Sequence, residues 1–521
     1  MATGAQTRSI GELLGRLGKE SVVYGLLTAA SSFASLLALP FLTAELAPPE
    51  YGAVALALVL VGLLAGLSSM GLDFSAARWF YDYDSRGWRN SVVATWFWTQ
   101  IVVSLLLGAA LAVAAPWIAA LVGLPADGTQ VLLLSAVLIP LAGIKNVAAG
   151  WFRFRRQPLR AAAVLGGGTV VSVVGMVTFV VLVPWGAAGA MFGQALAGLL
   201  IAVACLVALG RSLSIGGLSA SLLTSMLRFG LPLLPGVLAA WIVASSDRII
   251  LGMLKGADDV GLYALAASVA FSIALLTAAV RMAWAPFVYS MPEDEFSRSV
   301  IAQGTLWILW CGFFAAALLS ALAPAVVGVL AAPSYTSASG AVPILAFAEV
   351  TVIMAAAFAT GAGIARKPLA ITISVTVAAC LNIGLNFALI PSLGYLGAAW
   401  ATLAAGLAAA LVVYGLSQRL YRIDFPRVKL VVIGLVAVGL ATASQFCPDS
   451  TVAGNAVRVA IVSVMLIVPL VVGMVPRGAI RSRMRGQTTR EEIVSTLPSD
   501  SPDQPSGHNR QEGAGQTQVE E

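Results

Sequence analysis

Runs of about 20 apolar residues follow one another along most of this chain of 521 residues. A helix of about that length crosses the roughly 30 Å hydrocarbon core of a bilayer. Lipid cannot satisfy unpaired backbone groups, so each run must be helical to cross it. Because 59% of the residues are apolar and only 10% are charged, the sequence predicts an all-α polytopic membrane protein and excludes a soluble domain.

Fourteen such runs are present, and we predict that each is a transmembrane helix. Helix ends predicted from sequence carry an error of about 2 to 4 residues. The approximate bounds are 22–43, 51–70, 92–119, 129–151, 161–184, 187–209, 229–253, 260–283, 301–329, 339–363, 368–390, 396–417, 430–447 and 454–475.

The basic residues indicate how these helices are oriented. Lys and Arg are retained on the cytoplasmic side of a membrane, and 26 of the 30 fall in alternate segments that include both ends of the chain. We therefore predict that both termini are cytoplasmic, and we attribute the net charge of +6 to orientation, not to nucleic-acid binding. Residues 1–21 are predicted to hold a short amphipathic helix on the inner surface, and residues 477–521 a disordered cytoplasmic tail.

The second half of the chain repeats the first. The glycines and prolines Gly52, Pro158, Gly186 and Gly189 recur, shifted by 208 to 210 residues, as Gly261, Pro368, Gly394 and Gly397. Six helices separate equivalent points, so both halves cross the membrane in the same direction. The sequence predicts two parallel six-helix lobes, 22–210 and 211–418, related by a pseudo-twofold axis along the membrane normal, with two accessory helices in 419–476. Duplicated membrane halves are typical of transporters that bind substrate between the repeats.

Four stretches also give the chain a resemblance to a known family. They are residues 39–52, residues 229–263 with Phe229-Gly230-Leu-Pro232-Leu-Leu-Pro235, the triplet Ala285-Pro286-Phe287, and residues 382–402 with Asn382-Ile-Gly-Leu-Asn386. From about Ser21 to about Gln418 the chain resembles the polysaccharide-transport branch of the multidrug, oligosaccharidyl-lipid and polysaccharide exporter superfamily.

The resemblance implies a flippase of the bacterial cytoplasmic membrane that uses alternating access. It would move undecaprenyl-diphosphate-linked oligosaccharide repeat units from the inner to the outer leaflet, for surface polysaccharides such as lipopolysaccharide or exopolysaccharide. Its partners would be the lipid-linked substrate, membrane lipids, and a polysaccharide polymerase or export machinery. The alternatives of the same fold are a peptidoglycan-precursor flippase and a drug/cation antiporter.

An enzyme fits the sequence less well than a transporter. A membrane glycan polymerase or ligase needs a substantial outer loop, whereas every predicted outer loop has about ten residues or fewer. The sequence holds no Cys/His cluster, so no cofactor and no metal site is predicted.

Ionisable residues inside the predicted helices are the first candidates for the substrate site, because a charge at that depth is costly. Lys145, about 9 Å from the inner end of its helix at 1.5 Å per residue, and Arg248 are candidates to bind the diphosphate. The Lys145 side chain can instead extend to the inner headgroups. Asp247 and Glu349 are candidate coupling or charge-partner residues. Glu349 can take up a coupling proton or pair with Lys145, and Asp247 and Arg248 can instead form a structural network.

Three arginines at predicted inner helix ends are further candidates. Arg78, Arg228 and Arg281 can simply anchor the chain, or they can form a vestibule that attracts the diphosphate. Asn382 and Asn386 share one helix face, from which they can bind sugar hydroxyls or neighbouring helices.

Glycine and proline crowd the start of the seventh predicted helix. Gly230, Pro232 and Pro235 predict a kink there, because proline removes a backbone donor and glycine has weak helix propensity. We interpret this kink as a candidate gate or hinge, with simple entry geometry as the alternative.

Overall fold

A computed structural model of the protein describes residues 31, 33–183, 185–274, 284, 287–447 and 452–474. The chain divides into two units, Met1–Val468 and Pro469–Glu521, and only residues 469–474 of the second are described. The predicted amphipathic segment 1–21, the predicted tail 477–521 and the candidate Arg281 lie outside the described residues. Of the second unit, residues 469–471 complete the short helix α20 (Val468–Val471).

The first predicted lobe consists of helices. An apolar helix, Phe33–Glu45, is the described part of the first predicted span. The helices that follow are α2 (Pro48–Ser69), α3 (Leu72–Trp79), α4 (Arg86–Val122), α5 (Gly128–Phe154), α6 (Pro158–Ala162), a π-helical turn (Ala163–Gly167), α7 (Gly168–Val181), α8 (Gly186–Leu209) and two short 3₁₀ turns (Gly210–Leu213 and Ile215–Gly217).

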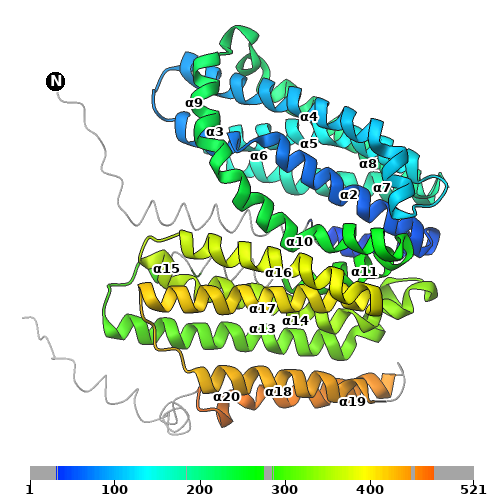
Figure 1. The fold of residues 1–521 in the computed structure, drawn as a ribbon, viewed down its shortest axis with the longest axis vertical. Coiled ribbons are helices and arrows are strands. Elements are labelled where there is room, and N and C mark those ends of the chain that lie inside the picture. The colour runs from blue at the N-terminus through cyan, green and yellow to red at the C-terminus, as the bar shows by residue number, and fades with distance from the viewer. Residues whose placement is uncertain are drawn as a thin grey trace, which may run out of the picture. The chain divides into compact units, whose positions relative to one another are not determined.

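The second predicted lobe and the accessory helices are also helical. They comprise α9 (Ala220–Gly230), a 3₁₀ turn (Leu231–Leu233), α10 (Leu234–Lys255), α11 (Ala257–Ala270), α13 (Glu295–Leu330), a 3₁₀ helix (Pro333–Gly340), α14 (Val342–Phe358), α15 (Thr360–Ile364), α16 (Leu369–Leu393), α17 (Tyr395–Leu420), α18 (Arg427–Gln445), α19 (Val452–Ser463) and a 3₁₀ turn (Val464–Leu466). The accessory helices α18 and α19 pack against α13 (Figure 1).

The described residues contain 13 helices that are long and apolar enough to cross a membrane. The all-α fold is therefore confirmed. Side chains such as Val113, Trp117 and Leu121 of α4 are more than 60% exposed, as expected where lipid rather than protein covers a helix.

Equivalent turns in the two lobes have the same unusual backbone. Arg156 and Arg366, which follow α5 and α15, have φ of 56° and 53°, and Gly186 and Gly394 both have φ of 57°. Left-handed residues other than glycine are uncommon because Cβ crowds the backbone. The arginine pair, 210 residues apart, and the glycine pair, 208 residues apart, show that the sequence repeat is a structural repeat.

The lobes meet where α2 crosses α11, between the repeated glycines Gly52 and Gly261. A Cβ added to Gly52 would lie 1.9 Å from the carbonyl oxygen of Ala257, and one added to Gly261 would lie 1.9 Å from that of Pro48. No side chain fits at either position, so the two backbones touch. Small residues permit this close packing of membrane helices.

Two hydrogen bonds, made by residues just before the start of α2, add to this contact. Tyr335 donates its hydroxyl to the Leu46 carbonyl at 2.8 Å, and the Ala332 backbone N–H donates to Thr43 Oγ1 at 3.2 Å. By the orientation predicted from the basic residues, this is the outer end of the protein.

The helix α9 packs with the first lobe, although it continues through a 3₁₀ turn into α10. Leu222 and Met226 of α9 belong to a buried cluster with residues of α3, α4 and α5, and Ser75 Oγ donates to the Met226 carbonyl at 2.7 Å. In contrast, α10 packs most extensively on α16 of the second lobe, with smaller contacts to α11 and to α2 (Figure 1). The two halves of this long helix therefore belong to different lobes.

Candidate functional site

Two adjoining cavities lie among the helices of the two lobes. The first has a volume of about 660 Å³ and is lined mainly by the first lobe. The second has a volume of about 890 Å³ and is lined mainly by the second lobe. The residues that line both cavities are Ser35, Thr169, Ser245, Arg248 and Ser268. A polar substrate can therefore contact both lobes at once.

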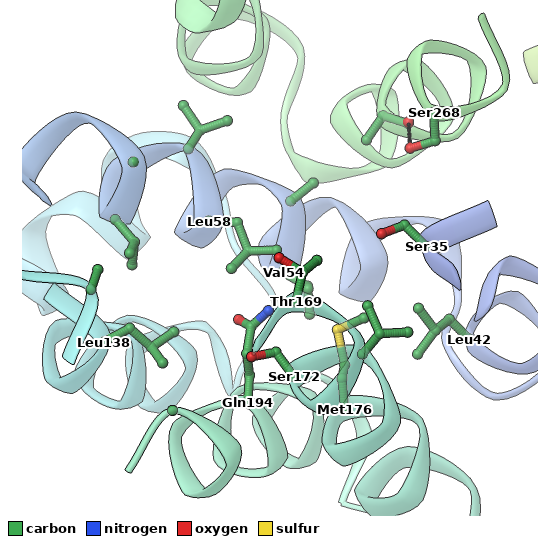
Figure 2. A pocket seen from close by; sticks show the side chains of 18 of the residues that line it. Ser35, Leu42, Val54, Leu58, Leu138, Thr169, Ser172, Met176, Gln194 and Ser268 are labelled. Carbon is green, nitrogen blue, oxygen red and sulfur yellow. Dashed lines mark hydrogen bonds between the residues drawn. The ribbon is translucent and has the colours of Figure 1, made fainter. Parts of the chain in front are cut away.

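Polar side chains line one wall of the first cavity. Thr169 and Ser172 come from α7, Gln194 comes from α8, and Figure 2 shows the three side chains next to one another, with Leu58 and Leu138 nearby. Lys145 of α5 lines the same cavity. The Gln194 Oε1 atom is buried and has no hydrogen-bond partner among the described residues, so the wall holds an acceptor that a ligand can satisfy.

Arg248 of α10 lines both cavities. Its guanidinium carbon lies 5.9 Å from the centre of the Tyr263 ring. Its Nε atom is buried without a hydrogen-bond partner among the described residues, and none of the ion pairs in that part of the chain involves Arg248 or Lys145. Among the described residues, therefore, two cations that form no ion pair face the adjoining cavities.

Asp247 is held in a network within the second lobe. Its Oδ2 atom accepts hydrogen bonds from the Tyr263 hydroxyl and from Thr402 Oγ1, the latter at 3.2 Å. Its Oδ1 atom accepts from the Arg248 backbone N–H at 2.9 Å. The side chain is 3% exposed. Asp247 is thus the acceptor that joins α10, α11 and α17, and it also lines the second cavity, so its coupling role stays a prediction.

Glu349 of α14 lines the second cavity, whereas Lys145 lines only the first. No described hydrogen bond or ion pair connects the two residues. The structure therefore places Glu349 and Lys145 in adjoining cavities without pairing them, and the proton-binding role of Glu349 stays a prediction.

Asn382 and Asn386 of α16 lie away from the cavities. Both are fully buried, and neither lines the two cavities. Asn382 Oδ1 accepts from Ser246 Oγ of α10 and from Asn386 Nδ2, both at 3.0 Å. This contact corresponds to the predicted helix-to-helix alternative.

The inner arginines that the structure describes also lie outside the cavities. Arg78 forms an exposed ion pair with Asp82 at 2.5 Å, and Arg228 is exposed at the end of α9. Neither residue lines the two cavities. A vestibule role for Arg78, Arg228 and Arg281 stays a prediction.

The predicted kink coincides with the turn between α9 and α10. Pro232 lies within the 3₁₀ turn, and Pro235 lies in the first turn of α10. Gly230 touches the backbone at the α2–α3 junction, because a Cβ added to it would lie 2.7 Å from the Gly71 carbonyl oxygen. The break therefore falls where the long helix passes from one lobe to the other.

Sequence comparison identifies the family to which these lobes and cavities belong. The pattern of the family described as polysaccharide biosynthesis protein matches residues 17–291, which is more than half of the chain. The chain belongs to the polysaccharide biosynthesis protein family. The match extends from before the first described helix into the second lobe, and it covers Lys145, Asp247 and Arg248.

A relative of similar sequence is the succinoglycan biosynthesis transport protein ExoT of Rhizobium meliloti (strain 1021). It is 27% identical to this chain over 228 residues, which are 44% of each chain. The aligned part thus spans less than half of that relative.

Solved structures show the same fold in transporters. The lipid II flippase MurJ in an inward closed conformation superposes with a TM-score of 0.70 and 12% identity, covering 90% of this chain and 99% of that one. A multidrug resistance MATE family transporter of the MOP superfamily in an inward-facing conformation has a TM-score of 0.58 and 17% identity, covering 79% and 98%. The two-lobed all-α fold predicted from the repeat is therefore confirmed.

Proposed function

We propose that this protein is a flippase that moves undecaprenyl-diphosphate-linked oligosaccharide repeat units from the inner to the outer leaflet of the bacterial cytoplasmic membrane. The observation that carries the proposal is the pair of adjoining cavities, faced by Lys145 and Arg248, neither of which forms an ion pair with another described residue. Membership of the polysaccharide biosynthesis protein family supports a glycan precursor as cargo.

The chemistry of the cavities matches the parts of such a substrate. A diphosphate carries negative charge, and charge-assisted hydrogen bonds from Arg and Lys are the strong ones. Thr169, Ser172 and Gln194 supply hydroxyl and amide groups for sugar hydroxyls. A lipid-linked substrate can leave its polyprenyl tail in the surrounding hydrocarbon while the polar head occupies the cavities.

The proposal assigns separate roles to the parts of the chain. The predicted lobes 22–210 and 211–418 move against each other, with α9 moving as part of the first lobe, on which it packs. Residues 419–476 are accessory, and both termini are cytoplasmic. The cavities take up substrate from the inner leaflet and open to the outer leaflet when α2 and α11 separate. A polysaccharide polymerase or export machinery receives the product.

Leaflet-resolved transport of an undecaprenyl-diphosphate-linked saccharide in reconstituted vesicles tests this function. Lys145→Ala and Arg248→Ala should each slow transport roughly tenfold or more, because each removes a charged hydrogen-bond donor worth about 1.5–3 kcal/mol. Arg422→Ala is the matched control, since Arg422 is exposed and pairs with Asp424. Arg281→Ala in the same assay tests the predicted vestibule.

Two outcomes would reject the assignment. Unchanged rates in Lys145→Ala and Arg248→Ala would remove the cationic cavities as the substrate site. A wild-type protein that transports lipid II but no oligosaccharide repeat unit would replace the proposed cargo with a peptidoglycan precursor.

A further inference from the structure

A third pocket lies outside the two central cavities, at the predicted cytoplasmic end of the first lobe. Its volume is about 670 Å³, and it is formed around the start of α4 and the end of α5. Aromatic residues that include Trp151 and Phe154 line it, together with four arginines, which are Arg86, Arg89, Arg155 and Arg156. None of these residues lines the central cavities.

Among the described residues, acidic side chains pair with only part of the positive charge of this arginine pocket. Arg89 pairs with Asp84, and among the described residues it is the only one of the four arginines in an ion pair. Its Nε atom is nevertheless buried without a hydrogen-bond partner there. Arg155 lies over the ring of Trp151, with its guanidinium carbon 4.7 Å from the ring centre. Stacking on an aromatic ring orients a guanidinium and leaves its N–H edge free for an anion.

The second lobe provides an internal comparison. The first turn of α4 is capped by Ser85, which accepts from the Trp88 N–H, and the first turn of α13 is capped by Asp294, which accepts from the Ser297 N–H. These caps are 209 residues apart, so the two helix starts are in register. At this spacing of 209 residues, Glu295 and Arg298 occupy the positions of Arg86 and Arg89. After α5 the spacing is 210 residues, and there Ala365 and Arg366 occupy the positions of Arg155 and Arg156.

This difference separates the arginine pocket from simple membrane orientation. The second lobe has the same architecture at its predicted cytoplasmic end, yet it has an acid in place of Arg86 and an alanine in place of Arg155. Positive charge near the inner surface serves orientation in both lobes. The complete set of four arginines at these positions is therefore a feature of the first lobe.

We propose that the arginine pocket binds the phosphate-bearing headgroup of a lipid in the cytoplasmic leaflet. Guanidinium groups bind phosphate oxygens through paired hydrogen bonds, and aromatic side chains favour the depth of the headgroups. Either an anionic phospholipid or the polyprenyl diphosphate carrier supplies this chemistry. The proposal uses the membrane orientation of the proposed function but does not require that the central cavities transport anything.

Binding of defined lipids to the purified full-length protein in detergent tests the pocket, by native mass spectrometry and by the thermal unfolding shift. Phosphatidylglycerol is compared with diacylglycerol, and undecaprenyl diphosphate with undecaprenol, so that each pair differs in its phosphate group. The Arg86→Gln/Arg155→Gln variant should bind the phosphate-bearing lipid about tenfold or more weakly, because two charged donors are lost. Arg298→Gln/Arg422→Gln removes the same charge from the second lobe and should bind as the wild type does.

The pattern of losses decides between the outcomes. A loss confined to undecaprenyl diphosphate identifies the carrier as the ligand, and a loss confined to phosphatidylglycerol identifies a phospholipid. Equal binding by the first-lobe variant and the wild type, or an equal loss in the second-lobe control, overturns the proposal. Lys145→Ala/Arg248→Ala should keep binding at the arginine pocket, so a failure of the transport proposal would leave this result standing.

Discussion

At the scale of single residues, Asp247 shows how a buried charge is accommodated. Both of its oxygens accept hydrogen bonds within the protein, from Tyr263, Thr402 and the Arg248 backbone. Removing the acceptor in Asp247→Ala leaves buried donors unsatisfied, which costs about 1–3 kcal/mol. We expect a lower unfolding temperature for Asp247→Ala than for Asp247→Asn, which keeps an acceptor. Asp258→Ala, at an exposed position in α11, is the control for loss of charge.

Transport by the same variants separates structure from coupling. If Asp247 serves only as an acceptor, Asp247→Asn should transport at a rate close to that of the wild type. A folded Asp247→Asn protein with strongly reduced transport would instead show that the negative charge takes part in the transport cycle.

Asp73 of α3 is expected to make stability depend on pH. Burial raises the pKa of its carboxyl, against smaller opposing effects of backbone hydrogen bonds and Arg153, and its Oδ1 atom has no described hydrogen-bond partner. The folded protein therefore binds this proton more tightly than the unfolded chain does, so the charged form is penalised near neutral pH.

The measurement for Asp73 is the difference in unfolding temperature between wild type and Asp73→Asn as a function of pH. Asp73→Asn should be the more stable protein at about pH 7, and its advantage should shrink as the pH falls through the raised pKa towards about 4. A difference that is constant with pH would contradict the assignment.

At the scale of elements, the turn between α9 and α10 links the two lobes. Pro232 and Pro235 lack backbone donors at the point where the helix passes from the first lobe to the second. Pro232→Ala/Pro235→Ala allows one continuous helix, and we expect transport to fall severalfold while the protein still folds. Pro324→Ala, inside α13, is the matched control. Normal transport by the double variant would remove the hinge from the mechanism.

Sequence patterns predicted the membrane-spanning helices well, because length and hydropathy determine whether a helix can cross a membrane. Thirteen of the predicted spans correspond to helices, and the kink at Pro232 coincides with a 3₁₀ turn. The packing of α9 on the first lobe was not predictable in this way. Lipid and protein core are both apolar, so the pattern along a membrane helix does not mark which face meets a neighbour.

The candidate site was also predicted only in part, because the sequence pattern does not show which face of a membrane helix lines a cavity. Lys145 and Arg248 were found because a charge in an apolar helix is conspicuous, and both line the cavities. Thr169, Ser172 and Gln194 were missed, since single neutral polar residues in membrane helices have no spacing that separates a cavity wall from a helix contact. For Asn382 the sequence left two alternatives, and its hydrogen bond from Ser246 corresponds to the helix contact, not to a cavity wall.

At the scale of the whole molecule, alternating access requires the lobes to separate where Gly52 and Gly261 touch. An added methyl group at Gly52 would overlap the Ala257 carbonyl oxygen at 1.9 Å, whereas one at Gly66 of the same helix meets nothing within 4 Å. Gly52→Ala should therefore force α2 and α11 apart, and Gly66→Ala should not. Because the contact lies at the predicted outer end, Gly52→Ala should favour the outward-open state.

Labelling of a cysteine in the cavities measures this change. Ser268 lines both cavities, so Ser268→Cys, in a protein whose four native cysteines are replaced, reports access from outside to a membrane-impermeant maleimide. We expect faster labelling in Gly52→Ala and Gly261→Ala than in Gly66→Ala, together with slower transport, because a gate that cannot close interrupts the cycle. Equal labelling rates in all three proteins would mean that the contact of α2 with α11 is a fixed part of the core, and that the lobes must open elsewhere.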